Sequence, residues 1–336
     1  MIKWGKTAPA QIMKKMIKYL DYFFVLRPTL FFPVWTMSLA GLWAQTRFTA
    51  SSRQPSWFGI GSFELEILFY ELLLTLLMGS VFLLNQIEDV ESDKLNNKLF
   101  LIANGDISIG KAYLETIILA AAPVIYLLLT RFELGITLII AYFVMGWLYS
   151  SRPFVLKNKP VGGIIPNVFG FYIVFSYGWM INGEPGMDML YHATPYVLGL
   201  LGVYFFTTIP DIEGDRGANK ITVAVKYGAN KIIITGLIVI ILALNAAAIM
   251  RDLVIVIPIF LIFPFFVKTA ITKSVADVLQ TNKFAALFLS LVICYRFPYY
   301  LVIMIVLYFF SKWYYKARFN INYPSLHKQE TANEKN

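Results

Sequence analysis

The sequence predicts an all-α integral membrane protein built as a bundle of about nine transmembrane helices. Of its 336 residues, 58% are hydrophobic and only 15% are charged, and the mean hydropathy is +0.64. Soluble domains carry roughly 25% charged residues, so a soluble enzyme is disfavoured. The apolar residues form long continuous runs instead of alternating with polar ones, which excludes a transmembrane β-barrel.

Nine apolar runs approach the roughly 20 residues that a helix needs to cross the hydrocarbon core. They are residues 23–45, 64–87, 109–130, 134–150, 162–181, 193–210, 231–250, 252–270 and 284–310. The first run is too long for a signal peptide and contains Arg27, Pro28 and Pro33, so we expect a retained helix. The short connections predict one membrane domain over residues 23–310, between a basic N-terminal tail (1–22) and a polar C-terminal tail (311–336) that we expect to be disordered from Tyr323.

The charges and the rare residues exclude several other classes. The single cysteine excludes an intramolecular disulfide, and two histidines are too few for a Cys/His zinc site. The net charge of +9 suits either nucleic acid or anionic lipid. In so apolar a chain a membrane surface is the better interpretation, and no nucleic-acid partner is expected.

Basic residues predict the orientation, because short loops rich in Lys and Arg stay in the cytoplasm. The N-terminal tail holds five lysines, and the connections after the second, fourth, sixth and eighth runs hold most of the other basic residues. The connections after the first, third, fifth and seventh runs hold only Arg47, Arg53, Arg131 and Arg251. We therefore expect a multi-pass cell-membrane protein with a cytoplasmic N-terminus. Nine spans then put the C-terminal tail outside although it carries five basic residues from Lys312 onward, and this conflict stays open.

The second run ends in a polar stretch that we call the first acidic station, residues 85–93. In a helix that continues through it, Asn85, Asp89 and Asp93 share a face about 80° wide. Charged groups at the ends of membrane helices are candidates for function because burying them is costly.

A second acidic station, residues 211–216, ends the sixth run. Asp211 and Asp215 are again four positions apart, and each lies 122 positions after its counterpart in the first station. A single such pair is usually a polar cap. Two equivalent pairs on the same predicted side indicate a weak internal duplication, with both pairs facing one cavity.

Four carboxylates in one cavity repel each other unless cations lie between them. Hard oxygen ligands suit Mg²⁺, which shares its coordination sphere readily with phosphate oxygens, and two ions match four carboxylates in charge. Lys and Arg in the same connections could bind a diphosphate, although the positive-inside rule alone could also put them there. These residues are Lys94, Lys98, Arg152, Lys157, Arg216, Lys220 and Lys226.

Together these motifs resemble the intramembrane prenyltransferases of the UbiA superfamily, which have nine transmembrane helices and two aspartate-rich motifs. The resemblance begins at Arg27 and Pro28 and reaches Gly228. The first family motif is matched by Asn85, Asp89 and Asp93. The second is matched by Asp211, Glu213, Gly214, Asp215, Arg216, Thr222, Val223 and Gly228. A third phrase is matched by Tyr149, Ser150, Pro153, Leu156 and Lys157.

The resemblance implies Mg²⁺-dependent transfer of a polyprenyl group from a prenyl diphosphate to a lipophilic or aromatic acceptor, with release of diphosphate. It implies metal binding and catalysis by Asp89, Asp93, Asp211 and Asp215, with Asn85 completing the metal site. Tyr149 would stabilise an allylic cation or hydrogen-bond the diphosphate, and the sequence leaves both roles open. The expected substrate-binding residues are Asn85, Arg27, Lys94, Arg152, Lys157, Arg216 and Lys220.

The chain departs from the family pattern after the first motif. Many members have an Arg-rich phrase ending in R-P-x-x-x-G, but here residues 96–108 keep only the Gly and the Ile-Ser that follow it. Neither the acceptor nor the prenyl length can be read from the motifs. Two other classes fit the sequence less well: a CDP-alcohol phosphotransferase, whose D-G-x-x-A-R phrase is missing, and a secondary transporter, which is expected to carry its carboxylates near the membrane midplane.

Overall fold

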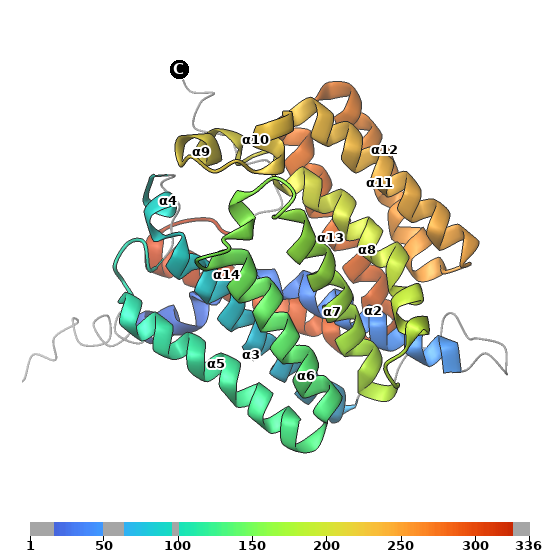
Figure 1. The fold of residues 1–336 in the computed structure, drawn as a ribbon, viewed down its shortest axis with the longest axis horizontal. Coiled ribbons are helices and arrows are strands. Elements are labelled where there is room, and N and C mark those ends of the chain that lie inside the picture. The colour runs from blue at the N-terminus through green and yellow to red at the C-terminus, as the bar shows by residue number, and fades with distance from the viewer. Residues whose placement is uncertain (1–16, 50–63, 96–100, 325–336) are drawn as a thin grey trace, which may run out of the picture.

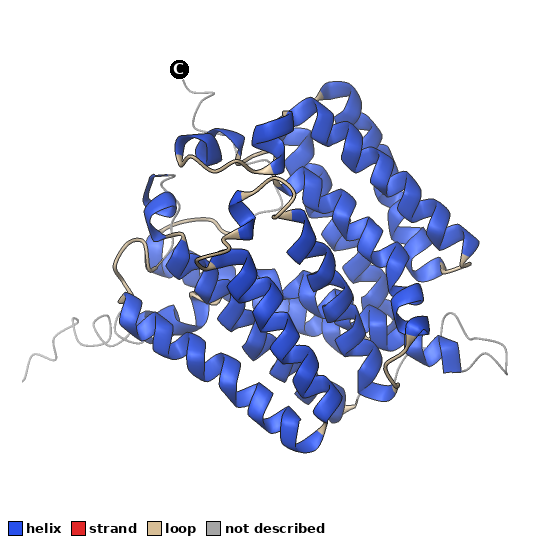
Figure 2. Ribbon diagram, in the orientation of Figure 1, coloured by secondary structure: helices blue, strands red, loops and turns tan. Residues whose placement is uncertain are grey.

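A computed structural model describes residues 17–49, 64–95 and 101–324, and within these ranges the regular elements are all helical (Figure 2). Eight helices are long and apolar enough to cross a membrane, and a shorter apolar helix covers Phe132–Leu148. The predicted fold class, an all-α membrane bundle of about nine spans, is therefore confirmed.

The helices follow the predicted runs closely. The long ones are α2 (Phe31–Thr49), α3 (Leu65–Glu88), α5 (Ile109–Thr130), α7 (Ile164–Asn182), α8 (Met187–Thr207), α11 (Ala229–Ile249), α12 (Leu253–Thr272), α13 (Val275–Arg296) and α14 (Pro298–Phe319). The shorter ones are η1 (Pro28–Leu30), α4 (Val90–Leu95), α6 (Phe132–Ala141), η2 (Tyr142–Leu148), η3 (Leu156–Asn158), α9 (Ile212–Gly217) and α10 (Val223–Tyr227).

The membrane helices pack as a closed circuit (Figure 1). Successive helices contact each other in the order α2, α3, α5, α6, α7, α8, α11, α12 and α13. Helix α13 in turn contacts α2, which closes the circuit. Contacts between α2 and α7 cross this circuit and divide the bundle into two halves. The acidic stations belong to different halves, since α3 leads to the first and α8 to the second.

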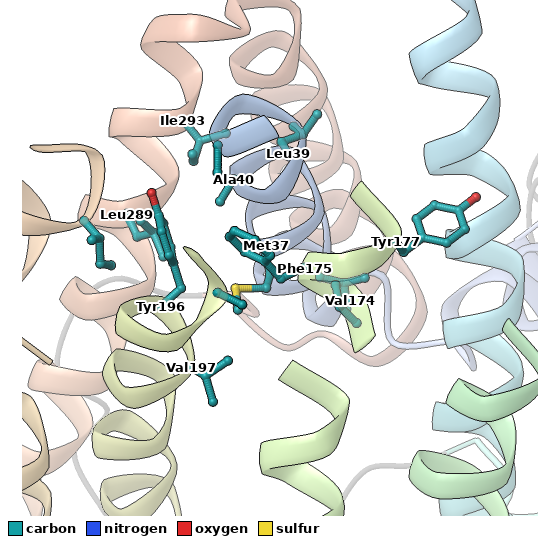
Figure 3. Packing of buried hydrophobic residues seen from close by; sticks show 14 of the residues in the cluster. Met37, Leu39, Ala40, Val174, Phe175, Tyr177, Tyr196, Val197, Leu289 and Ile293 are labelled. Carbon is teal, nitrogen blue, oxygen red and sulfur yellow. The ribbon is translucent and has the colours of Figure 1, made fainter. Parts of the chain in front are cut away.

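Glycines permit the close crossing of α2 and α7. A Cβ atom on Gly178 would lie 1.7 Å from the carbonyl oxygen of Ser38, and one on Gly41 would lie 2.0 Å from that of Phe175. Figure 3 shows Met37 and Phe175 close together in this core, while Tyr177 points away from them. The Tyr177 hydroxyl donates to the Tyr70 carbonyl at 2.8 Å, which ties α7 to α3.

The prediction of a single ninth helix over residues 284–310 is wrong, because the helix is interrupted within this run. Helix α13 ends at Arg296, and α14 begins at Pro298. Proline disfavours helical geometry at the preceding residue and fits the first position of a new helix. Phe297 accordingly has φ −122° and ψ 76°.

This break returns the chain to the end of the bundle that holds the first station. Near the end of α14, Arg318 pairs with Asp21, which precedes α2, and with Asp106, which precedes α5. The basic tail therefore begins at the same end of the bundle as those segments, although α14 is not among the eight helices that are long and apolar enough to cross a membrane. The predicted domain boundary at residue 311 falls inside α14.

The first run is also interrupted. Residues 17–24 are helical, so the predicted boundary at residue 22 falls inside a helix. The chain then turns at Arg27, whose φ of 55° is left-handed, and η1 begins at Pro28. Most of the predicted N-terminal tail, and residues 325–336 of the predicted C-terminal tail, lie outside the described residues.

Candidate active site

Helix α4 follows α3 after a break at Asp89, whose φ is −99° and ψ is 4°. The amide of Asp89 donates to the Asn85 carbonyl at 3.1 Å, and the amide of Asp93 donates to the Asp89 carbonyl at 2.8 Å. The turn-by-turn spacing predicted for the first station is therefore kept. The equivalent bond in the second station joins the Asp215 amide to the Asp211 carbonyl at 2.8 Å.

Two lysines bind the Asp89 carboxylate, one on each oxygen. The Lys157 ammonium lies 2.8 Å from Oδ2, and the Lys220 ammonium lies 2.9 Å from Oδ1. All three side chains are largely buried, with exposures of 14% for Asp89, 9% for Lys157 and 17% for Lys220. Lys157 comes from the connection before α7 and Lys220 from the one after α9, so Asp89 joins both halves of the bundle. We call these three residues the Asp89 clamp.

Asn85 extends the clamp by one helical turn. Its Oδ1 accepts hydrogen bonds from the Lys157 ammonium at 2.8 Å and from the Ser150 hydroxyl at 3.0 Å. Lys157 therefore bridges Asn85 and Asp89, which places a cation along the face that the two residues share.

Backbone bonds fix the loops that carry the lysines. The Ile221 amide donates to the Asn158 carbonyl at 3.2 Å, and the Lys220 amide donates to the Asp215 carbonyl at 2.8 Å. The connection before α7 is thus joined to the segment that follows the second station, and that segment is bonded to Asp215. Lys157 and Lys220 reach Asp89 from adjacent segments of backbone.

The clamp changes the pKa values of its members. Burial acts to raise the pKa of Asp89, but the ammonium groups of Lys157 and Lys220 outweigh burial and hold that pKa below its ordinary value. Burial lowers the pKa of Lys157, against the opposing effect of Asp89. A depressed carboxyl pKa keeps Asp89 anionic at neutral pH, as a ligand for cations requires.

A cavity of about 220 Å³ adjoins the clamp. Arg27, Asn85, Tyr149 and Asn167 supply its polar lining. Tyr149 is hydrogen-bonded to the side chain of Asn167, and the charges of Asp89 and Asp215 both act on it. One carboxylate of each station therefore acts electrostatically on the same tyrosine, which follows directly on the π-helical turns of η2.

The structure separates the predicted site residues into two groups. Asn85, Asp89, Lys157 and Lys220 are joined by direct contacts, and Arg27 and Tyr149 line the adjoining cavity. Asp93 is buried and Asp215 is half-buried, whereas the exposed ones are Asp211, Lys94, Arg152, Arg216 and Lys226. Lys98 lies outside the described residues.

Sequence reasoning gave no role to Ser150 or Asn167. Ser150 stands within a motif that was recognised, so its hydroxyl could have been assigned together with Tyr149. Asn167 is an isolated amide near the start of an apolar run, and that isolation was its signal.

The predicted metal ligands are not gathered into one ready-made cluster. Within the described ranges, no three His, Cys, Asp or Glu side chains are arranged to hold a metal ion. Instead, the ammonium groups of Lys157 and Lys220 supply the positive charge at Asp89. The oxygen donors of Asn85, Asp89 and Asp215 suit Mg²⁺ chemically, so the site fits the ion and the full ligand set stays a prediction.

Comparison with known proteins defines the class. The model of the UbiA prenyltransferase family matches residues 34–292, and the chain belongs to this family. It is therefore a multi-pass integral membrane protein.

Individual curated relatives match a smaller part of the chain than the family model does. The chain is 32% identical over 175 residues, 49% of its length, to probable homogentisate phytyltransferase 2, chloroplastic, of Oryza sativa subsp. japonica, covering 46% of that protein. It is also 32% identical over 177 residues to homogentisate solanesyltransferase, chloroplastic, of Arabidopsis thaliana, covering 49% of this chain and 45% of that one. The chain thus spans about half the length of the curated relatives that it matches.

Solved structures share the fold. A UbiA homolog from Archaeoglobus fulgidus bound to DMAPP and Mg²⁺ superposes with a TM-score of 0.62 at 18% identity. The match covers 83% of this chain and 98% of that chain. At this identity the likeness supports the fold alone, and the chemistry has to be argued from the residues of this chain.

Proposed function

We propose that this protein transfers a prenyl group from a prenyl diphosphate to an aromatic acceptor within the membrane and releases diphosphate. The observation that carries the proposal is the Asp89 clamp, in which two lysines from separate connections meet one carboxylate beside a cavity lined by Arg27 and Tyr149. Such a site combines groups for binding a metal ion with groups for binding phosphate oxygens.

The reaction balances as follows. The bond between C1 of the prenyl group and the diphosphate oxygen breaks, and the electron pair leaves with diphosphate. A new bond forms between C1 and a carbon of the electron-rich ring, which then loses its proton to water. Mg²⁺, when bound at Asp89 and its partners, supplies positive charge that stabilises the leaving diphosphate.

The residues of this chain bind and orient the donor. Lys157 and Lys220 can exchange a carboxylate oxygen for a phosphate oxygen, because an ammonium binds either anion as a point charge. Arg27 lines the same cavity, where its planar guanidinium suits two phosphate oxygens at once.

Tyr149 is proposed to act at the prenyl carbon. Its hydroxyl is engaged by Asn167, which fixes the ring within the cavity. A fixed aromatic face can stabilise an allylic cation through its negative charge density. Of the two roles left open by the sequence, the hydrogen bond to Asn167 favours this one.

The acceptor class is proposed from the relatives, two of which are named as homogentisate prenyltransferases. We propose a phenolic ring acceptor and a site on the cytoplasmic side of the membrane. The alternative function, a secondary transporter, predicts paired carboxylates at the midplane, whereas Asp89 stands at the end of α3.

Diphosphate release tests the proposal. The purified protein in lipid, given geranylgeranyl diphosphate, homogentisate and Mg²⁺, should release diphosphate and yield a prenylated phenol detectable by mass spectrometry. Asp89→Asn should lose at least 99% of this activity, while Asp188→Asn, an exposed aspartate in the first turn of α8, should keep it. Full activity in Asp89→Asn would contradict the proposed site.

A further inference from the structure

A second cavity lies between α2, α3 and α14, far from the Asp89 clamp. Its volume is about 420 Å³, within the range that protein pockets for small molecules occupy. Its walls are mainly apolar and include Phe31, Leu68, Leu72, Val306 and Phe310. Leu72 and Val306 are exposed on the surface of the bundle, so we call this cavity the lateral groove.

One carboxyl group lines this apolar groove. Glu71 is only 7% exposed, and its Oε1 accepts a hydrogen bond from the Ser38 hydroxyl at 2.7 Å. The other oxygen, Oε2, is buried and has no hydrogen-bond partner among the residues that the structure describes. Leaving such a buried oxygen without a partner is unfavourable, because no hydrogen bond replaces the water that it loses on burial.

Two neighbouring polar groups bind elsewhere, while the buried hydroxyl of Tyr299 also lines the groove and the charge of Glu71 acts on it. The Trp35 indole donates to the Thr75 hydroxyl at 2.6 Å, and the Tyr300 hydroxyl lies 2.8 Å from that of Thr36. Thr75 in turn donates to the backbone carbonyl of Glu71 at 2.6 Å. The second oxygen of Glu71 is thus a buried acceptor at the groove that no hydrogen bond among the described residues satisfies.

We propose that the lateral groove binds a lipophilic phenol whose hydroxyl hydrogen-bonds Oε2 of Glu71. A hydroxyl both donates and accepts, so it satisfies this oxygen whether the carboxyl is ionised or protonated. The ring packs against aromatic walls, where Trp35 lies 5.8 Å from Phe31 and 6.2 Å from Tyr300 between ring centroids. The apolar tail leaves along Leu72 and Val306 toward the lipid.

The groove is a site distinct from the proposed active site. Glu71 precedes Asn85 by fourteen residues on α3, which separates them by about 21 Å along the helix. Helix α14, which forms one wall, lies beyond the family match at residues 34–292. A prenylated phenol, the product proposed above, belongs to the ligand class of the groove, and that link alone rests on the proposed function.

Binding can be measured without turnover. The probe is 2-bromo-4-dodecylphenol, whose bromine quenches tryptophan fluorescence, added to the full chain in phosphatidylcholine nanodiscs. The part of the quenching that disappears in Trp35→Phe reports the groove. The quenching should saturate with probe concentration. Glu71→Leu should raise the half-saturating concentration roughly fivefold, as the loss of one hydrogen bond implies.

Three further variants make the result decisive. Glu71→Gln keeps a group that can accept and donate, so it should bind like the intact chain. Glu115→Leu removes another carboxyl with a buried oxygen on α5, outside the groove, and should change nothing. Val306→Phe fills the groove from its exposed side and should abolish saturable quenching even if Glu71→Leu does not fold.

Two results would overturn the proposal. Quenching that rises linearly with probe concentration shows only partition into lipid. Equal saturation in Glu71→Leu and the intact chain shows that the groove binds acyl chains without recognising a hydroxyl. Because the assay contains no prenyl diphosphate, failure of the proposed activity leaves its outcome unchanged.

Discussion

At the scale of single residues, Lys157 is the centre of the proposed active site because it contacts two members of the first station. Its ammonium is bonded to Asp89 and Asn85, whereas Lys220 is bonded to Asp89. Both lysines hold the pKa of Asp89 down against the effect of burial. Removing either cation must therefore let that pKa rise.

The variant Lys157→Met tests this electrostatic role. A carboxyl with a depressed pKa contributes stability above its unfolded pKa of about 3.9 and loses it as pH falls through the folded value. In Lys157→Met the folded pKa of Asp89 rises, so we expect the acid limb of the kcat/KM profile to move to higher pH. At neutral pH we expect kcat/KM to fall at least tenfold, as loss of hydrogen bonds to charged groups implies.

Two lysine variants calibrate that result. Lys220→Met should move the acid limb in the same direction with a smaller loss of kcat/KM, since it contacts Asp89 but not Asn85. Lys159→Met changes an exposed lysine in the same connection as Lys157 and should leave the profile in place. An acid limb that does not move in Lys157→Met shows that Asp89 does not control it.

The same residues show how far sequence reasoning reaches. Asn85, Asp89, Lys157 and Lys220 were all predicted, because acidic motifs and basic connections are visible in the sequence. The ion pairs between these lysines and Asp89 were not predicted, because membrane topology alone can also place basic residues in these connections. Only the fold distinguishes Lys157 from the exposed Arg152. Glu71 was passed over because one carboxylate barely changes the hydropathy of an apolar run.

At the scale of helices, the crossing of α2 and α7 controls the stability of the bundle. Backbone atoms of Ser38 occupy the space that a side chain at Gly178 needs, and backbone cannot move aside as a flexible side chain can. Gly178→Ala should therefore lower the free energy of unfolding by about 1 to 3 kcal/mol, or prevent folding. The measurement is the temperature of the thermal transition in detergent, which should fall.

A second glycine provides the control. A Cβ atom on Gly110, in the first turn of α5, would meet nothing within 4 Å. Gly110→Ala should leave the transition unchanged or raise it slightly, because alanine favours helix by up to about 1 kcal/mol. Equal transitions in both variants would mean that the crossing tolerates a wider separation than the structure has.

Helix positions were predicted well, and helix ends less so. Residues 109–130 were predicted without error because polar residues flank that run on both sides. The prediction of one helix over residues 284–310 was wrong because the apolar sequence continues through Phe297, so hydropathy alone does not mark the break. Pro298 carried the missing signal.

At the scale of the whole molecule, α14 determines at which end of the bundle the described part of the chain finishes. Helices α14 and α3 line the same lateral groove, and the last turn of α14 is bound through Arg318 to Asp21 and Asp106. The Tyr314 hydroxyl also donates to Asp21 at 2.6 Å. These contacts put the end of α14 on the side of the acidic stations.

Cysteine labelling tests this arrangement in intact cells. Cys294 is buried and is the chain's one cysteine, so Cys294→Ser gives an unreactive background. Lys226→Cys follows the second station, Lys316→Cys lies near the end of α14, and Glu184→Cys lies between α7 and α8. All three positions are exposed, so access of a membrane-impermeant maleimide depends on the side of the membrane.

The excess of lysine and arginine in the station-side connections predicts that this side is cytoplasmic. Glu184→Cys should then react with the maleimide added outside the cells, while Lys226→Cys and Lys316→Cys should react only after the membrane is opened. If Lys316→Cys reacted together with Glu184→Cys, α14 would not return the chain to the station side. The lateral groove would then lose one of its three walls, and the active-site proposal, which needs no residue of α14, would stand unchanged.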